Sequence, residues 1–363
     1  MMMREPMEIK EVDYIVVGAG LAGTVLAHQL IKQGHKTIVV NNSAMPAASM
    51  VAAGLYNPIT GKKFLKTWKS EIILPFMADF YREIEQLTNA KFFYPMPIEV
   101  PIDSAEEHNI IHGRSAYNDE EEIKIFIKSA DEKLPIKNEL GVFYTNHSGF
   151  VDVATFLEAS WQLFSSQDSM VEALFDATEV KFETSEVGWK NIKAKKIIFC
   201  EGYRFAENPF FNWLPIIPTK GELLKVKMDN GDEDKIYRKK VFLIPNGNGA
   251  FKCGSTYRWE FEDDLPSEYG LQELTQHLED LIKSEYLVVE HLAGIRPASK
   301  DRKPILGLHP IYSALAMFNG LGSKGVSMAP YFAHQLVLFL EGKIELEREI
   351  NIERHYKYFT NHA

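Results

Sequence analysis

The sequence predicts a protein of the α/β class, α+β overall, in which a parallel-sheet domain is interrupted by an inserted domain with an antiparallel or mixed sheet. A strand, a glycine-rich turn, a helix and a second strand follow one another near the start of the chain. Two more strand-then-glycine junctions occur later, and alternating strands lie between the early and late parts. The 363 residues also exceed the length at which one hydrophobic core usually divides in two.

The first strand is expected at residues 14–17, a short apolar run of the kind that forms a buried parallel strand. The helical spacing of Leu26, Leu30 and Ile31 predicts a helix that Gly34 ends. Further strands are expected at residues 37–40, 196–200 and 314–318. The start of the chain therefore forms a strand–turn–helix–strand unit.

Other helices are expected at residues 70–87, 156–164 and 326–340. The last of these contains Pro330 and is too short to span a bilayer, so we expect a core helix. In the middle of the chain, residues 222–228 alternate apolar and charged side chains. Residues 240–245 and 250–256 flank Asn-Gly-Asn-Gly at 246–249, which predicts a hairpin because both central turn positions need a positive φ.

The glycine-rich turn has the spacing of a dinucleotide-binding motif, since Gly18, Gly20 and Gly23 follow a strand and open a helix. The first glycine allows the tight turn, the second lets the backbone approach a pyrophosphate, and the third lets the helix pack on the strand. The helix N-terminus then faces the phosphate charge. The cofactor-binding residues expected here are Gly18, Ala19, Gly20, Leu21, Ala22 and Gly23.

The end of the second strand departs from that motif. An acidic side chain that accepts both hydroxyls of the adenosine ribose normally stands there, whereas this chain has Asn41, followed by Asn42 and Ser43. An amide accepts such a hydrogen bond without the charge that strengthens it. Because no arginine follows, a 2′-phosphate is not favoured either. We expect Asn41 and Asn42 at the ribose, with weaker binding.

The C-terminal region contains an ordered series of motifs: Gly-Ile-Arg-Pro at 294–297, Lys-Pro-Ile-Leu-Gly at 303–307, Gly-Leu-Gly-Ser-Lys-Gly at 320–325 and Ala-Pro at 329–330. Together with the N-terminal glycines, this series resembles the D-amino-acid-oxidase-like superfamily of FAD-dependent oxidoreductases, which includes glycine oxidase and sarcosine oxidase. Stretches at 149–152, 218–222, 243–245 and 254–256 also resemble that family. The stretches 54–58 and 322–325 are similar to the oxidase half of the bifunctional wobble-uridine tRNA modification enzyme, whose methyltransferase half has no counterpart here.

The resemblance implies a Rossmann-like FAD-binding domain with an inserted substrate domain. We expect residues 1–68, 146–217 and 291–363 to form the FAD-binding domain, and residues 69–145 and 218–290 to form the substrate-binding domain. Covalent attachment of flavin in this family needs a cysteine or histidine, and neither residues 49–51 nor the segment after Arg296 offers one. The resemblance therefore implies non-covalent FAD.

The resemblance also implies roles for Arg296, Tyr257 and Lys324. Arg296 would hold a substrate carboxylate in a bidentate fork, with a structural ion pair as the alternative. Tyr257 would line the substrate pocket, with core packing as the alternative, and Lys324 would face the negative charge of reduced flavin or else solvent. Further cofactor-binding residues are expected at Gly54, Leu55, Gly202, Arg296, Gly320, Gly322, Ser323, Lys324 and Gly325.

The implied reaction is oxidation of the C–N bond of a small amine or amino acid. A hydride passes to the flavin, water hydrolyses the imine, and oxygen or an electron-transfer partner removes the electrons. One alternative is a tRNA-modifying FAD oxidase that acts on an aminomethyl-uridine. Another is a catalytically silent flavin-binding module, which is suggested by Asn41 and by Phe242, where some relatives have a tyrosine.

The net charge of -10 argues against a nucleic-acid partner, because such proteins usually carry a basic patch or stripe. Cys200 and Cys253 form no disulfide framework, and neither they nor the histidines show metal-ligand spacing. The polar N-terminus lacks an apolar signal core. We therefore expect a cytoplasmic protein with no metal and no membrane span.

Overall fold

The computed structural model describes residues 9–45, 47–60, 65–116, 124–184, 186–229 and 231–359. Its internal contacts divide the chain into two compact units. The first unit comprises Met1–Met50, Leu157–Pro218 and Arg296–Ala363. The second comprises Val51–Phe156 and Thr219–Ile295.

The boundaries of these units differ from the expected domain boundaries: residues 51–68, 146–156 and 291–295 belong to the second unit, and residue 218 belongs to the first. The reason for the first two differences is a small antiparallel sheet in which β10 (Gly149–Val151) pairs with β3 (Leu55–Tyr56) and β6 (Phe93–Pro95). These three strands are far apart in the sequence, so no local pattern shows that they belong together.

The first unit is built on a largely parallel sheet that contains the predicted strand–turn–helix–strand unit. Its central strand, β1 (Lys10–Val17), pairs in parallel with β2 (Thr37–Asn41) on one side and with β14 (Ile192–Phe199) on the other. Two more parallel strands extend the sheet, β11 (Met170–Glu172) beside β2 and β21 (Leu315–Asn319) beside β14. Antiparallel strands complete it: β12 (Lys181–Phe182), β13 (Val187–Trp189) and β20 (Ile305–Leu308).

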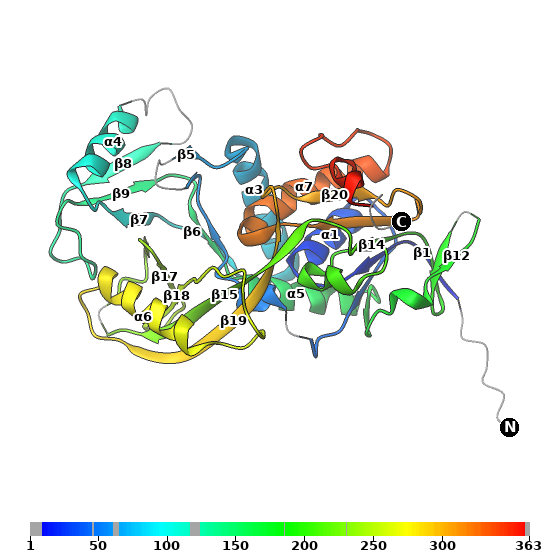
Figure 1. The fold of residues 1–363 in the computed structure, drawn as a ribbon, viewed down its shortest axis with the longest axis horizontal. Helices are drawn as coiled ribbons and strands as arrows, with labels where there is room; N and C mark the ends of the chain where they lie inside the picture. The colour runs from blue at the N-terminus through cyan, green and yellow to red at the C-terminus, as the bar shows by residue number, and fades with distance from the viewer. Residues whose placement is uncertain are drawn as a thin grey trace. The chain divides into compact units, whose positions relative to one another are not determined.

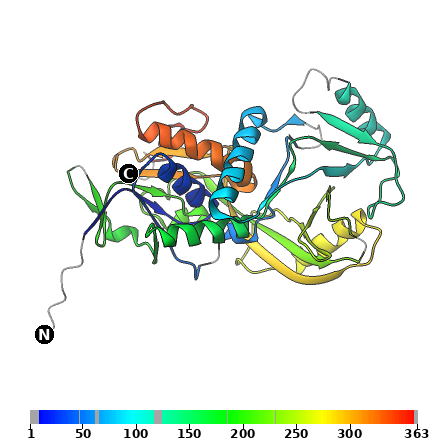
Figure 2. The ribbon, with the colours of Figure 1, turned by 180° about the vertical axis from the view of Figure 1, so that it is seen from behind.

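Helices cover one face of this sheet. Helix α1 (Leu21–Lys32) and helix α7 (Gly325–Leu340) lie side by side, as both views in Figures 1 and 2 show. Helix α5 (Val153–Ser166) contacts α1, because buried His28 of α1 is hydrogen-bonded to Ser160 at 2.9 Å. Within the described ranges, no helix combines the length and the apolar character needed to cross a membrane.

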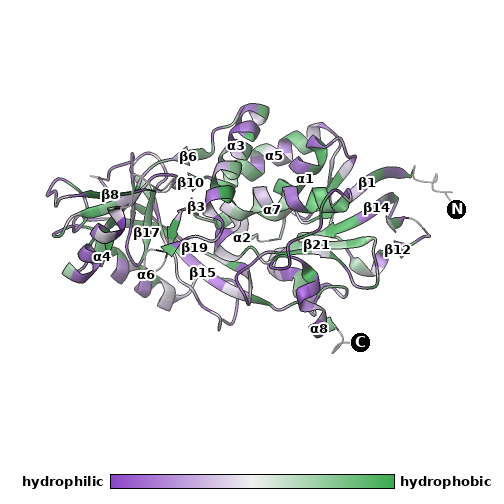
Figure 3. Ribbon diagram, turned by 90° about the horizontal axis from the view of Figure 1, so that it is seen from above, coloured by the Kyte–Doolittle hydropathy of each residue, from purple (hydrophilic) through white to green (hydrophobic). Residues whose placement is uncertain are grey.

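The other face of the sheet carries a separate hydrophobic core. Side chains alternate across a strand, so Ile15 and Val17 of β1 and Ile38 and Val40 of β2 face this core. Strand β21, which contributes Leu315 and Met317, is largely green in the hydropathy view of Figure 3. Aromatic residues beyond the sheet fill the rest of the core: Phe205, Phe211, Trp213, Tyr356 and Phe359.

The second unit is built on a mixed eight-stranded sheet, of which five strands come from its later segment: β19 (Leu287–Ser299), β15 (Ile216–Lys227), β18 (Ala250–Gly254), β17 (Phe242–Pro245) and β16 (Ile236–Arg238). The earlier segment adds β7 (Ile98–Pro101), β9 (Val142–Thr145) and β8 (Ile125–Lys128). The predicted hairpin is confirmed, because β17 and β18 are antiparallel and φ is +77° at Gly247 and +54° at Asn248.

Helices α4 (Ala105–Ser115) and α6 (Glu268–Leu281) contact this sheet, and α3 (Ser70–Thr88) contacts β6 of the small sheet. Helix α6 buries Leu274, Leu278 and Leu281 in one core with Leu224 of β15 and Phe251 of β18. Its apolar residues recur at helical spacing, and its N-cap is Ser267, whose hydroxyl accepts a hydrogen bond from Gly270. The expected helix at residues 70–87 corresponds to α3 and is confirmed.

Candidate active site

The glycine-rich turn between β1 and α1 has the geometry that its first and third glycines require. Gly18 has a φ of +94°, and a Cβ there would lie 2.8 Å from the carbonyl oxygen of Cys200. A Cβ at Gly23 would lie 1.9 Å from the carbonyl oxygen of Gly18. Packing therefore excludes a side chain at both positions, and the positive φ disfavours one at Gly18 as well.

The N-terminus of α1 is suited to an anion. Its N-cap is Gly20, which supplies no capping side chain, and the first turn contains no acidic residue. The first N–H groups of a helix have no intrahelical partner and carry the positive end of the helix dipole. The turn thus fits the pyrophosphate of a dinucleotide, because the positive end of the helix dipole meets no acidic side chain in the first turn.

Two side chains hold this turn in place through its N–H groups. The Oδ1 atom of Asn41, at the end of β2, accepts a hydrogen bond of 3.0 Å from the N–H of Ala19. The hydroxyl of Ser49 accepts one of 3.0 Å from the N–H of Leu21. Asn41, predicted to contact the ribose, therefore uses its oxygen on the turn itself.

The carbonyl group of Ala19 is held as well. It accepts hydrogen bonds of 3.0 Å from the hydroxyl of Thr24 and 3.0 Å from the indole Nε1 of Trp161. The sequence did not predict these contacts. Trp161 is 142 residues from Ala19 in the sequence, and no local signal connects the two.

The segments after β14 and β21 meet at the same edge of the sheet as the turn. The side-chain amide of Asn319 donates a hydrogen bond of 2.8 Å to the carbonyl oxygen of Gly202. A Cβ at Gly325 would lie 2.9 Å from the Cδ2 atom of Leu21, so the start of α7 approaches the start of α1. The structure therefore brings together the candidate residues of the first unit from distant parts of the chain. They lie at the carboxyl ends of parallel strands, where ligands bind in open α/β sheets.

Arg296 and Lys324 lie on neighbouring segments of the first unit. Arg296 is in β19, two residues before Ala298, which forms an isolated antiparallel bridge with Leu321. Leu321 is the residue before η4 (Gly322–Lys324), a short 3₁₀ turn. Arg296 and Lys324 are both partly buried. In the turn before Lys324, Gly320 and Gly322 have positive φ values of +77° and +54°.

Gly54, Leu55 and Tyr257 belong to the second unit. A Cβ at Gly54 would lie 1.8 Å from the carbonyl oxygen of Val151, so close packing of β3 on β10 accounts for this glycine. Leu55 is opposite Phe150 in the same pair of strands. Tyr257 is 43% exposed and packs edge-on against Trp259, with 5.6 Å between ring centroids, so it is not a core residue.

The backbone on both sides of Tyr257 is fixed to β15. Thr256 donates its N–H to the carbonyl oxygen of Glu222 at 3.1 Å, and its hydroxyl accepts from the N–H of Glu222 at 2.9 Å. Arg258 and Lys220 exchange two backbone hydrogen bonds of 2.8 and 3.0 Å. This ladder holds the segment that carries Tyr257 beside β15.

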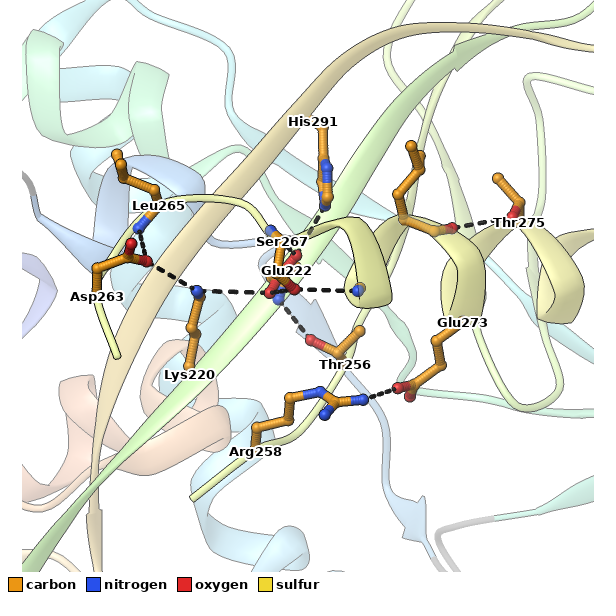
Figure 4. A network of polar contacts seen from close by, with 12 residues as sticks. Lys220, Glu222, Thr256, Arg258, Asp263, Leu265, Ser267, Glu273, Thr275 and His291 are labelled. Atoms are coloured by element: carbon orange, nitrogen blue, oxygen red, sulfur yellow. Dashed lines mark hydrogen bonds and ion pairs between the residues drawn. The ribbon is translucent and has the colours of Figure 1, made fainter. Parts of the chain in front are cut away.

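Glu222 is the centre of a buried polar network that the sequence did not reveal (Figure 4). Its carboxylate accepts hydrogen bonds from the N–H and hydroxyl of Ser267, at 2.9 and 2.8 Å. His291 Nε2 lies 2.9 Å from one carboxylate oxygen, and Lys220 Nζ lies 3.7 Å from the other. The network joins β15, β19 and the start of α6.

One further titratable group lies beside the glycine turn. The Cα atom of Glu201 would be 3.5 Å from a Cβ at Gly18, and burial raises the pKa of Glu201 to about 7, although a hydrogen bond from Asn208 opposes the shift. Burial also raises the pKa of the neighbouring Cys200 thiol and brings that of Cys253 to about 12. Neither cysteine is therefore a ready nucleophile.

A family model described as FAD dependent oxidoreductase matches residues 13–337. The chain belongs to this family. FAD is therefore its cofactor, and the glycine turn of the first unit has the geometry to receive it. In the described part of the chain, no three histidine, cysteine, aspartate or glutamate side chains are grouped so that they could hold a metal ion.

The relatives of this FAD-dependent oxidoreductase include bifunctional proteins and glycine oxidases. The bifunctional tRNA 5-methylaminomethyl-2-thiouridine biosynthesis protein MnmC of Shewanella amazonensis is 23% identical over 394 residues, which cover 92% of this chain and 57% of that protein. The glycine oxidase of Pseudomonas aeruginosa is 23% identical over 370 residues, which cover 91% of this chain and 94% of that protein. The chain spans just over half the length of the first curated relatives it matches, which are bifunctional.

The fold agrees with these relationships. The crystal structure of glycine oxidase from Geobacillus kaustophilus superposes with a TM-score of 0.76 at 18% sequence identity, covering 93% of this chain and 96% of that one. The family match and this superposition confirm the predicted fold class, an FAD-binding domain with an inserted substrate domain.

Proposed function

We propose that this FAD-dependent oxidoreductase oxidises the C–N bond of a small amine or amino acid that carries a carboxylate. The glycine oxidase of P. aeruginosa, which the chain matches over nearly the whole length of both proteins, supports this substrate class. So does an iminodiacetate oxidase from Chelativorans sp. BNC1, whose structure superposes with a TM-score of 0.76 at 18% identity.

The observation that carries the proposal is the position of Arg296. Its strand runs beside the glycine turn at residues 320–325, through the bridge between Ala298 and Leu321. A guanidinium there can hold a carboxylate in two parallel hydrogen bonds and fix the orientation of the adjacent C–N bond. Bound flavin supplies the two-electron acceptor.

Other residues of the chain have supporting roles in this proposal. Lys324 and the N–H groups at the start of α7 favour negative charge on the bound cofactor. Tyr257 is proposed as the substrate-facing residue of the second unit. FAD is held non-covalently, and oxygen or an electron-transfer partner receives the electrons. The two cysteines are free and buried, which suits a reducing, cytoplasmic compartment.

Steady-state kinetics of Arg296→Ala and Arg296→Lys test the proposal. Losing a charged, bidentate contact should raise KM for a carboxylate substrate by about one to two orders of magnitude. Arg296→Lys should recover part of this loss, because it restores the charge without the fork. Flavin content should change far less than KM, and Arg348→Ala, at an exposed position in the first unit, is the matched control. Unchanged kinetics in Arg296→Ala would remove this residue from the substrate site.

A second candidate is oxidation of an aminomethyl-uridine in tRNA, favoured by the match to MnmC over 92% of this chain. The net charge of -10 weighs against it. Binding of tRNA that weakens steeply as salt rises would support this candidate, because phosphate contacts release counterions. No measurable complex at low salt would exclude it.

A further inference from the structure

The oxygen of Asn41 already accepts a hydrogen bond from the glycine turn, so β2 offers the adenosine ribose only a shared and uncharged acceptor. Asn41 Oδ1 accepts the N–H of Ala19 at 3.0 Å, which leaves one lone pair of that oxygen and the NH₂ donor. Ribose hydroxyls are donors, and a charged acceptor binds them more strongly than an amide does. A carboxylate nearby would supply what this position lacks.

Such a carboxylate stands on the adjacent strand. Glu172 is the last residue of β11, and the parallel register of β11 and β2 places it directly opposite Asn41. Paired residues of neighbouring parallel strands direct their side chains to the same face of the sheet. Glu172 and Asn41 therefore share both the face and the carboxyl edge of the sheet.

The carboxylate of Glu172 is held in place by the turn that follows β2. Its Oε1 atom accepts hydrogen bonds from the N–H of Ser43 at 2.5 Å and from the hydroxyl of Ser43 at 2.8 Å. A carboxylate has about four acceptor positions on its two oxygens. Oε2 can therefore accept further hydrogen bonds while Oε1 is engaged with Ser43.

We propose that Glu172 recognises the adenosine ribose of FAD, and that the acidic group of the dinucleotide motif has moved from the end of β2 to the end of β11. Asn41 then shapes the turn, and Glu172 accepts the ribose hydroxyls. A negative charge at this place also disfavours a 2′-phosphate. The inference depends on the proposed placement of FAD at the glycine turn of the first unit.

The test measures the dissociation constant of the apoprotein for FAD and for FAD whose adenosine lacks both the 2′- and the 3′-hydroxyl, by flavin fluorescence. Glu172→Gln should bind FAD about tenfold more weakly than wild type, as expected for loss of a charged hydrogen bond. Wild type and Glu172→Gln should bind the deoxy cofactor alike, because the contact is absent in both complexes. Glu179→Gln, an exposed glutamate later in the same segment, should bind both cofactors like wild type.

Two outcomes would overturn the inference. If Glu172→Gln weakens FAD and the deoxy cofactor equally, Glu172 acts only by holding Ser43. If it weakens neither, Glu172 does not contact the cofactor.

The placement of FAD is tested separately with Ala22→Asp and its neutral control Ala22→Asn. Aspartate in the first turn suits the helix dipole but repels a pyrophosphate, so only Ala22→Asp should lose FAD affinity. Equal affinity of the two variants would overturn the placement and the inference together. A loss in Ala22→Asp without a loss in Glu172→Gln would overturn the inference alone.

Discussion

The side-chain oxygen of Asn41 accepts a hydrogen bond of 3.0 Å from the backbone N–H of Ala19. This contact ties the end of β2 to the middle of the glycine-rich turn, where an acidic residue would normally face the cofactor. Asn41 thus supports the shape of the cofactor-binding turn.

Replacing Asn41 with alanine should weaken FAD binding through the turn. Removing the acceptor leaves the N–H of Ala19 without this partner, which costs about 1–2 kcal/mol when the group stays buried. We expect the dissociation constant of FAD to rise several-fold, measured by fluorescence titration of the apoprotein. Asn212→Ala is the control, since this asparagine is exposed and lies elsewhere in the first unit. Equal effects of the two variants would show that Asn41 has no special role.

Gly23→Ala should disrupt the turn, because its Cβ would lie 1.9 Å from the carbonyl oxygen of Gly18. Either α1 or the turn must shift, so we expect loss of FAD binding and a lower Tm. Gly113→Ala is the matched control, because it lies in helix α4 with nothing within 4 Å of the added Cβ. That change should stabilise the protein by about 0.5–1 kcal/mol, the usual difference between alanine and glycine in a helix. Retention of FAD by Gly23→Ala would contradict the described geometry.

Glu201 should make the stability of the apoprotein depend on pH. Burial raises the pKa of Glu201 from 4.5 to about 7, so the native state binds this proton more tightly than the unfolded chain does. The resulting stabilisation is complete below pH about 4.5, declines as pH rises, and is lost above pH about 7. Glu201→Gln keeps a neutral group, so its free energy of unfolding should gain about 1–3 kcal/mol relative to wild type between pH 4.5 and pH 8.

Urea unfolding at several pH values measures this difference. The free energy of unfolding of Glu179→Gln, at an exposed position, should have the same pH dependence as that of wild type. If the free energy of unfolding of Glu201→Gln also has the pH dependence of wild type, the pKa of Glu201 is not raised in the native state.

Glu222→Gln should destabilise the second unit strongly. The carboxylate is buried and is surrounded by Ser267, His291 and Lys220, so neutralising it breaks the buried ion pair with Lys220 and weakens the hydrogen bonds from Ser267. Breaking a buried pair costs about 3–5 kcal/mol, compared with less than about 1 kcal/mol for an exposed pair. Glu290→Gln breaks the exposed pair with Lys225 on the same sheet and serves as the control. Urea unfolding measures both variants. If Glu222→Gln and Glu290→Gln lose the same free energy of unfolding, the network around Glu222 does not stabilise the second unit as proposed.

The sequence predicted those parts of the fold that depend on local chemistry. Gly18 and the hairpin at residues 246–249 were predictable because a positive φ and a tight turn restrict which residues fit. The division of the chain into its two compact units was not predictable, since β3 pairs with β10 far along the chain.

The residues of the candidate site also divide into those that a local motif predicts and those that only the folded chain reveals. Arg296 and Lys324 could be named from their motifs, and the structure places their segments side by side. Glu172, Trp161 and Glu222 could not, because their partners are 129, 142 and 45 residues away in the sequence. Only the folded chain brings these groups together.

The most direct test of the proposed function is anaerobic titration of the purified, FAD-loaded protein with glycine, other amino acids and N-substituted glycines, followed by visible absorption. We expect the oxidised flavin bands to bleach with at least one compound that carries both an amine and a carboxylate. Bleaching by such a compound should weaken in Arg296→Ala and persist in Arg348→Ala. A flavin that binds normally but that none of these compounds reduces would contradict oxidation of a small amino acid.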